Sequence, residues 1–174
     1  MHIQNVEFKA RVENLETIEA LILSIQATFV ETQHQIDTYF NTSTARLKLR
    51  EAGGNHSLIH YDRANTDTAK ESDVIYYQHL PNAALKNILT AQLGVKVIVD
   101  KVRTIYAIDN VRFHLDIVQQ LGTFVEVEAM NEGQNHTMHS LKEQCDFYFN
   151  TFKLQPENLI DRSYSDLLLD QNAD

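Results

Sequence analysis

Bases recur at every second residue in several segments of this chain. Arg46-Leu47-Lys48-Leu49-Arg50 alternates bases with leucines, and Lys101-Val102-Arg103 places two bases around a valine. Because side chains on a β-strand alternate with a period of two, each segment would have one charged face and one apolar face. Eight of the fifteen Lys and Arg residues belong to such patterns: Lys9, Arg46, Lys48, Arg50, Arg63, Lys101, Arg103 and Arg112. In a chain with a formal net charge of −9, bases gathered in this way indicate a bound anion.

Four carboxylates share these strand faces with the bases. Glu7 lies two residues before Lys9, and Asp116 lies four residues after Arg112. Glu126 and Glu128 are two residues apart, which would put both carboxylates on one side of a strand. Bases mixed with hard oxygen ligands suit a polyanion that is bound together with a divalent cation. The alternative is an ordinary solvated sheet face, with the charges outside and the apolar face in the core.

The chain reads as eight strands interrupted by three helices. Strands are predicted at 3–12, 35–41, 44–51, 57–63, 73–79, 96–108, 110–117 and 123–130. The first helix would begin at Asn14 and carry apolar residues at helical spacing as far as Phe29. The second would run from Pro81 to Gly94, and the third would follow residue 136. Residues 64–72 read as a polar loop, and the segment around 164–169 reads as a short tail.

The helices favour charged strand faces that are turned inward. Their broad apolar stripes must cover an apolar surface, and the strands offer one. We therefore predict an α+β fold: a closed antiparallel eight-stranded β-barrel, or tunnel, with a polar charged lumen and α-helices outside. Residues 1–174 are expected to form a single domain, since no linker or repeat divides them.

Composition limits the setting and the partners. A single cysteine, Cys145, excludes an internal disulfide and fits a reducing compartment. The start of the sequence has no signal-peptide pattern, and no apolar run approaches the roughly 20 residues of a membrane span. The negative net charge is unlike that of general nucleic-acid binders, which are usually basic. We expect a cytoplasmic protein with no membrane or general nucleic-acid partner.

The order of the motifs resembles the CYTH family, the triphosphate tunnel metalloenzymes, which include class IV adenylate cyclases and thiamine triphosphatases. The resemblance runs from residue 3 to about residue 169 and is strongest to the class IV adenylate cyclase-like proteins. Eight segments carry it: Val6–Lys9, Asp37–Phe40, Arg46–Glu51, Tyr61–Arg63, Lys101–Arg103, Arg112–Asp116, Leu121–Glu128 and Ser163–Leu168. The family opens with Glu-x-Glu-x-Lys, whereas this chain has Asn5 at the first acidic position.

The resemblance implies a role for each of the singled-out residues. Metal ligands for Mg²⁺ or Mn²⁺ would be Glu7, Asp116, Glu126 and Glu128. Contacts to the triphosphate would come from Lys9, Arg46, Lys48, Arg50, Arg63, Lys101, Arg103 and Arg112. Catalytic roles would fall to Lys9, Arg50 and Arg112. A structural role is expected for His114, and Asp37 and Tyr39 are equally consistent with an architectural role and a substrate contact.

The implied activity has one leading version and two alternatives. The leading version converts ATP into cyclic AMP and pyrophosphate, as a class IV adenylate cyclase does. The first alternative is a triphosphatase that hydrolyses tripolyphosphate, thiamine triphosphate or a nucleoside triphosphate. The second is a non-catalytic module that binds polyphosphate or nucleotide, because Asn5 removes one charged ligand from the motif. The resemblance also allows a homodimer, although the sequence identifies no interface.

Overall fold

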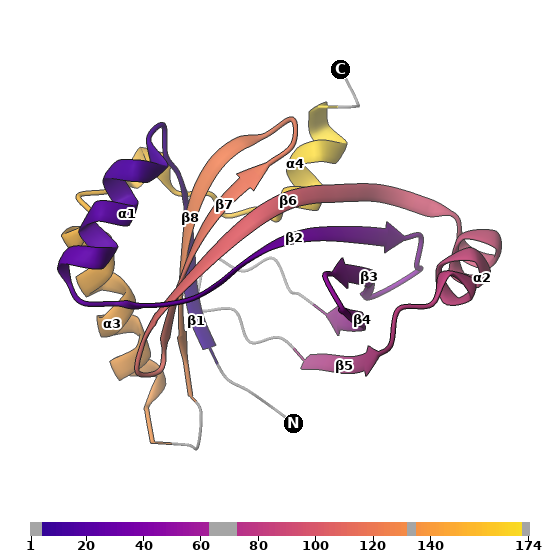
Figure 1. The fold of residues 1–174 in the computed structure, drawn as a ribbon, viewed down its shortest axis with the longest axis horizontal. Helices are drawn as coiled ribbons and strands as arrows, with labels where there is room; N and C mark the ends of the chain where they lie inside the picture. Colours follow the sequence, from indigo (N-terminus) through magenta and orange to yellow (C-terminus); the bar gives the residue numbers. More distant parts are fainter. Residues whose placement is uncertain (1–4, 63–72, 132–134, 172–174) are drawn as a thin grey trace.

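The strands form one eight-stranded antiparallel sheet in a computed structural model of the chain, which describes residues 5–62, 73–131 and 135–171 (Figure 1). The strand order is β1-β8-β7-β6-β2-β3-β4-β5, and every neighbouring pair is antiparallel. The strands are β1 (Asn5–Arg11), β2 (Thr28–Phe40), β3 (Arg46–Ala52), β4 (Asn55–Asp62), β5 (Asp73–His79), β6 (Val95–Ile108), β7 (Val111–Val118) and β8 (Gly122–Met130). This confirms the α+β class, the eight strands and their sequence order. The predicted loop at 64–72 lies outside the described residues.

Four α-helices accompany the sheet in the described ranges, one more than the sequence predicted. They are α1 (Leu15–Ser24), α2 (Ala83–Leu93), α3 (Met138–Thr151) and α4 (Tyr164–Gln171), and a short 3-10 helix spans Pro156–Asn158. The additional helix is α4, in the segment that was predicted to be a tail. None of these helices is long and apolar enough to cross a bilayer.

The first helix is shorter than its apolar pattern suggested. Asn14 caps it by accepting a hydrogen bond from the Thr17 amide at 3.1 Å, as expected for this residue type. The helix stops at Ser24, and Gln26 then adopts a left-handed φ of 63° that reverses the chain. Phe29 consequently lies in β2, where its ring packs edge-on against Tyr106 with 5.7 Å between centroids. The apolar period alone could not reveal this turn.

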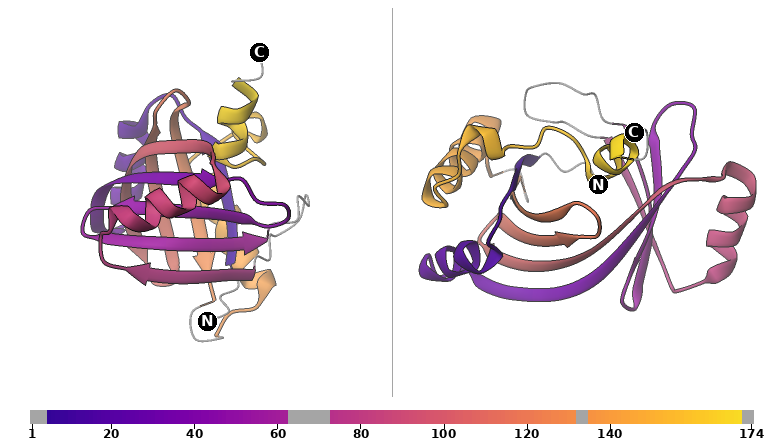
Figure 2. Two further views of the ribbon diagram at one scale, coloured as in Figure 1. Left: turned by 90° about the vertical axis from the view of Figure 1, so that its right-hand side faces the viewer. Right: turned by 90° about the horizontal axis from the view of Figure 1, so that it is seen from above.

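The sheet curls strongly but its hydrogen-bonded ladder does not close, which corrects the expected closed barrel (Figure 2). In the described chain, β1 pairs with β8 and β5 pairs with β4, and the two strands do not pair with each other. The outer edge of β1 is taken by the segment before α4. The Ile160 amide donates to the Lys9 carbonyl at 2.8 Å, and Leu159 forms a bridge with Ala10. A segment far along the chain thus occupies the edge that closure of the barrel would require.

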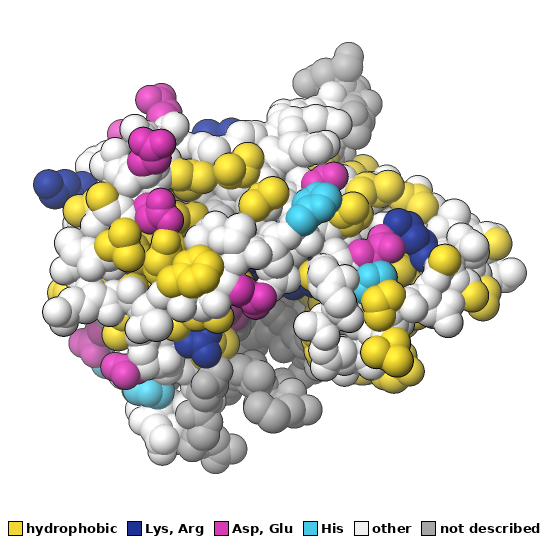
Figure 3. Space-filling view, viewed as in Figure 1, with side chains coloured by type: hydrophobic (Ala, Val, Ile, Leu, Met, Phe, Trp, Pro, Cys, Tyr) yellow, Lys and Arg dark blue, Asp and Glu magenta, His cyan; other side chains and the backbone are white. Residues whose placement is uncertain are grey.

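Two apolar clusters hold the curved sheet. The larger one lies where α1 and α3 cover the convex face, and it includes Ile22, Phe113, Val125 and Leu141, each with an exposed fraction of 0%. The smaller one lies beneath α4 and includes Phe124 and Tyr164. Because the strand faces of the larger cluster pack outward against α1 and α3, the opposite, charged faces of the same strands turn into the concavity. Few Lys and Arg side chains are visible on the face shown in Figure 3.

Candidate active site

Five of the eight bases singled out in the sequence converge on one cavity of about 230 Å³, which we call the basic cavity. They are Lys9 on β1, Lys48 and Arg50 on β3, and Lys101 and Arg103 on β6. The cavity is also lined by Asn5, Glu7, Asp37, Tyr39, Tyr61, Val99, Glu126, Ser163 and Tyr164. Strands from distant parts of the sheet contribute because the sheet curls around this space. The prediction that the charged faces turn inward is confirmed.

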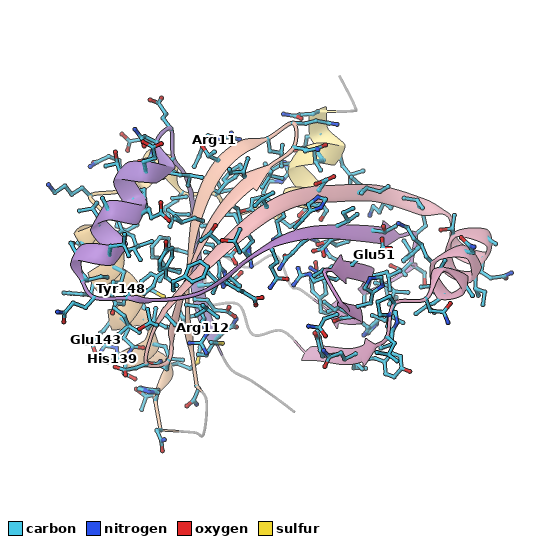
Figure 4. The ribbon with its side chains drawn as sticks, viewed as in Figure 1. Arg11, Glu51, Arg112, His139, Glu143 and Tyr148 are labelled. Atoms are coloured by element: carbon cyan, nitrogen blue, oxygen red, sulfur yellow. The ribbon has the colours of Figure 1, made fainter. Side chains whose placement is uncertain are left out.

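The other three bases have different places. Arg46 points to α4, where its guanidinium donates to Ser163 Oγ at 2.8 Å and to Asp166 Oδ2 at 3.0 Å. Arg112 lies near the ends of β6 and β7 that are remote from α4, and it donates to the Asp109 carbonyl at 3.3 Å (Figure 4). Neither residue lines the basic cavity. Arg63 lies outside the described residues.

Asp37 holds two of the three bases of β3, Lys48 and Arg50. Lys48 Nζ donates to Asp37 Oδ2 at 2.9 Å, and Arg50 donates from Nε to Oδ1 and from Nη2 to Oδ2, each at 2.7 Å. Burial works to raise the pKa of Asp37, but the charges of Lys48 and Arg50 together outweigh it and hold the pKa below its ordinary value. Asp37 is therefore a carboxylate that keeps two cations oriented in the basic cavity.

Asp116 orients Arg103 in the same way. Its carboxylate has an exposed fraction of 0% and accepts from Arg103 Nε at 2.7 Å and Nη2 at 2.6 Å. The Tyr164 hydroxyl donates to Asp116 Oδ2 at 2.7 Å, and Lys101 Nζ lies 3.7 Å from the same oxygen. Asp116 does not line the basic cavity, so its carboxylate lies behind the bases that do.

Glu126 is likewise surrounded by nitrogen donors. Lys9 Nζ lies 2.8 Å from Oε2, while Arg103 Nη2 and His114 Nδ1 lie 3.2 Å and 3.0 Å from Oε1. Burial opposes ionisation, but Lys9 and Arg103 together hold the pKa of Glu126 well below its ordinary value. Burial and then Arg103 lower the pKa of His114 to about 4, so its imidazole is neutral near pH 7 and donates to Glu126. This agrees with the structural role expected for His114.

Glu7 and Glu128 form the remaining acidic pair. They lie directly opposite each other in the β1–β8 register. Burial, then the charges of Glu7 and Glu126, raise the pKa of Glu128 to about 7. Asn5 Nδ2 donates to Glu128 Oε1 at 2.6 Å, so the residue that departs from the family motif stays next to this pair. A divalent cation would relieve the repulsion that raises this pKa.

The donor set at this pair fits a hard divalent cation. Two carboxylates and the amide oxygen of Asn5 are oxygen ligands, and Mg²⁺ commonly uses one or two carboxylates with substrate phosphates and water. No cluster of three or more His, Cys, Asp or Glu side chains arranged for a metal ion occurs in the described part of the chain. An ion at Glu7 and Glu128 would therefore complete its shell with phosphate oxygens and water.

Helix α4 supplies the residues that sequence reasoning missed. The ring of Tyr164 lies under two ammonium groups, with Lys9 Nζ 4.5 Å and Lys101 Nζ 5.2 Å from its centroid. Ser163 caps the helix by accepting from the Asp166 amide at 3.2 Å, which places Tyr164 at the first turn. The spacing Ser163-x-x-Asp166 is a recognisable helix-start signal. Tyr61 was also missed, since a lone tyrosine at a strand end carries no distinctive pattern.

A second cavity of about 870 Å³ adjoins the first, and we call it the outer cavity. Arg50 and Arg103 line both cavities, so the two cavities adjoin at these two arginines. The outer cavity is mainly bounded by β2 and by the β3–β4 hairpin. A ligand longer than a triphosphate could therefore extend past the two arginines.

Comparison with known proteins supports the same fold and family. The chain is 22% identical over 171 residues to the "Putative adenylate cyclase" of Methanocaldococcus jannaschii, which covers 93% of this chain and 97% of that protein. A solved structure from Pyrococcus horikoshii has a TM-score of 0.80 at 24% identity, with 94% of this chain and 98% of that chain covered. A "putative adenylyl cyclase" of Hippeastrum, described as having a dominant triphosphatase activity, has a TM-score of 0.66 at 12% identity, with 99% and 96% covered. The family model of the CYTH domain matches residues 4–164, so the chain belongs to the CYTH domain family.

Proposed function

We propose that the protein is a metal-dependent enzyme that cleaves a phosphoanhydride bond of a triphosphate held in the basic cavity, with ATP converted to cyclic AMP and pyrophosphate. The observation that carries this proposal is the convergence of five bases from three strands on a cavity that Glu7 also lines, while Glu128, opposite Glu7 in the β1–β8 register, lines the adjoining outer cavity. A triphosphate carries several negative charges in a row, and these cations would neutralise them. The likeness to proteins named as adenylate cyclases supports ATP as the substrate.

Glu7 and Glu128 are the proposed metal ligands, with the Asn5 carbonyl oxygen beside them. Asp116 and Glu126 are proposed to position the bases, because guanidinium, ammonium and imidazole groups already contact their oxygens. When bound, Mg²⁺ or Mn²⁺ would polarise phosphoryl oxygens and help to stabilise the charge that develops during transfer. The sequence-based set of four ligands is thereby reduced to two carboxylates.

The protein's own contribution is to orient the phosphates and stabilise negative charge. Arg50 and Arg103 are fixed by Asp37 and Asp116, so their planar forks are held in place before the substrate arrives. In the cyclase reaction, the ribose 3′-oxygen would bond to the α-phosphorus, and the bond to the departing pyrophosphate would break. The charge that gathers on pyrophosphate would be held by the ammonium and guanidinium groups of the basic cavity. The proton of the 3′-hydroxyl is released to solvent.

The second candidate is a triphosphatase, in which water instead attacks the γ-phosphorus. Two observations support it: the Hippeastrum relative is described as having a dominant triphosphatase activity, and the basic cavity is lined mostly by groups that suit phosphate. The same bases would serve either reaction, since both proceed by phosphoryl or nucleotidyl transfer with charge on phosphate oxygens.

Product identification separates these candidates. The purified protein would be incubated with Mg²⁺ or Mn²⁺ and ATP, tripolyphosphate or thiamine triphosphate, and cyclic AMP, pyrophosphate and orthophosphate would be measured. Cyclic AMP with equimolar pyrophosphate supports the cyclase, whereas orthophosphate without cyclic AMP overturns it in favour of the triphosphatase. Tight triphosphate binding with no product under either metal would contradict both and identify a binding module.

A further inference from the structure

Gln35 is a buried polar residue that the phosphate site leaves unused. It lies on β2 two residues before Asp37, so both side chains are on the same face of the strand. Its exposed fraction is 4%, and its Oε1 atom has no hydrogen-bond partner in the described part of the chain. Buried amide oxygens are nearly always hydrogen-bonded, so this acceptor indicates a donor from outside the described chain.

The outer cavity is where such a donor could arrive. Gln35 lines it together with Arg50 and Arg103, the two residues that also line the basic cavity. A molecule with its phosphates among the bases could therefore place its organic group beside Gln35. With about 870 Å³, the outer cavity is within the size range of small-molecule sites.

An aromatic ring is available in the same cavity. Tyr76 on β5 lines it, and its hydroxyl accepts a hydrogen bond from Ser57 Oγ at 2.6 Å. Ser57 is itself buried, with an exposed fraction of 2%, so it restrains the tyrosine hydroxyl. Planar bases stack favourably on aromatic rings of this kind.

We propose that the outer cavity holds the adenine of an adenine nucleoside triphosphate and that the Gln35 amide reads its exocyclic amine. This inference rests on the proposed function, because the phosphates must first occupy the basic cavity. A glutamine amide matches adenine at both ends: its oxygen accepts from the exocyclic amine, and its nitrogen donates to a neighbouring ring nitrogen. Gln35 Oε1 is buried in the free protein, so the amide would turn about its terminal torsion to present this oxygen to the ligand. Gln35 is thus the specificity-determining residue for the organic half of the substrate.

The test compares three ligands that share the triphosphate. They are ATP, purine riboside triphosphate, which is ATP without the exocyclic amine, and inorganic tripolyphosphate. Dissociation constants are measured by calorimetry in EDTA, where metal-dependent turnover cannot occur, for the wild-type protein and for Gln35→Met. Methionine has a similar length and no amide. Thermal melting of both proteins establishes that the variant is folded.

The expected result is a loss confined to one ligand. Wild-type protein should bind ATP about tenfold more tightly than purine riboside triphosphate, and Gln35→Met should remove that difference while leaving tripolyphosphate affinity unchanged. Equal affinity of the wild-type protein for ATP and purine riboside triphosphate would overturn the inference while leaving the proposed triphosphate site intact. An equal loss for all three ligands in Gln35→Met would also overturn it, since that indicates a structural role. If none of the three ligands binds the wild-type protein in EDTA, the titrations are repeated with Ca²⁺, which supplies a divalent cation to the phosphates. Absence of binding under both conditions means that the proposed function fails and the inference fails with it.

Discussion

Arg103 and Asp116 form a buried bidentate pair, with Nε 2.7 Å from Oδ1 and Nη2 2.6 Å from Oδ2. The two residues face each other across β6 and β7, and only the arginine reaches the basic cavity. The carboxylate behind it therefore determines where the guanidinium points. This arrangement, a buried acid that orients a phosphate-facing base, recurs at Asp37 with Arg50.

Removing the Asp116 carboxylate should destabilise the folded protein strongly. Asp116→Asn is expected to lower the free energy of unfolding by about 3 kcal/mol, because it removes the carboxylate charge that pairs with the buried Arg103 and leaves the 3.2 Å contact to Glu126 as its ion pair. Urea denaturation measures this. The matched control is Glu143→Gln, whose carboxylate pairs with His139 on the exposed side of α3 and should matter little. Equal stability of the two variants would contradict the positioning role of Asp116.

The Glu7–Glu128 pair should control the metal requirement. Glu7→Gln and Glu128→Gln are each expected to raise the Mg²⁺ or Mn²⁺ concentration for half-maximal activity at least about tenfold, because each removes one charged ligand. A metal titration of the initial rate checks this. Glu13→Gln, at an exposed position after β1, serves as the control. Unchanged metal dependence in both variants would show that the ion does not bind at Glu7 and Glu128.

Lys101 should make triphosphate binding depend on pH. Burial, and then the neighbouring Arg103, lower its pKa to about 7 in the free protein. A bound triphosphate favours the ammonium form and raises this pKa again, so binding above pH 7 takes up a proton. Affinity should therefore fall as the pH rises above about 7, by up to tenfold per pH unit.

Proton uptake is the measurement that isolates this effect. Calorimetric titration with tripolyphosphate at pH 8, in two buffers of different ionisation enthalpy, counts the protons bound. The uptake should decrease in Lys101→Met and remain in Lys142→Met, whose side chain lies on the exposed side of α3. The same uptake in Lys101→Met as in the wild type would assign the pH dependence to another group.

Tyr164 should contribute separately through its hydroxyl and its ring. Tyr164→Phe removes the hydrogen bond to Asp116 and is expected to lower the unfolding free energy by about 1.5–3 kcal/mol, the range for hydrogen bonds to charged groups. Tyr164→Leu also removes the ring beneath Lys9 and Lys101 and should raise KM for the triphosphate several-fold beyond Tyr164→Phe. Denaturation and steady-state kinetics of both variants test this. Identical KM values in the two variants would show that the ring does not position the lysines.

Strand alternation made much of the site predictable. The period of two placed Lys48 with Arg50 and Lys101 with Arg103, and these four bases do share one cavity. The same pattern also singled out Arg46 and Arg112, which do not line this cavity, since a side chain on the correct face can make its contacts elsewhere. Arg46 donates a hydrogen bond to Asp166 on α4. Arg112 lies near the ends of β6 and β7 that are remote from α4. Alternation predicts on which face of a strand a side chain lies, but not how far along the strand it lies from the basic cavity.

The carboxylates show the limit of sequence more clearly. Asp116, Glu126 and Glu128 read alike as acids on strand faces, but their surroundings differ. Arg103 and Tyr164 contact Asp116, Lys9 and His114 contact Glu126, and Glu128 faces Glu7. Those contacts join residues far apart in the chain, so no local pattern could separate a metal ligand from an acid that orients a base.

The sequence by itself determined the strands, the inward charged faces and the concentration of bases on them, because these follow from a local period of two and from apolar stripes that helices must cover. Only the tertiary structure decided that the segment before α4 pairs with the free edge of β1, that α4 places Tyr164 beneath two lysines, and that a buried Gln35 lines a second cavity. These features depend on contacts between distant segments. Their energies come from burial and charge pairing in three dimensions, which composition and spacing do not specify.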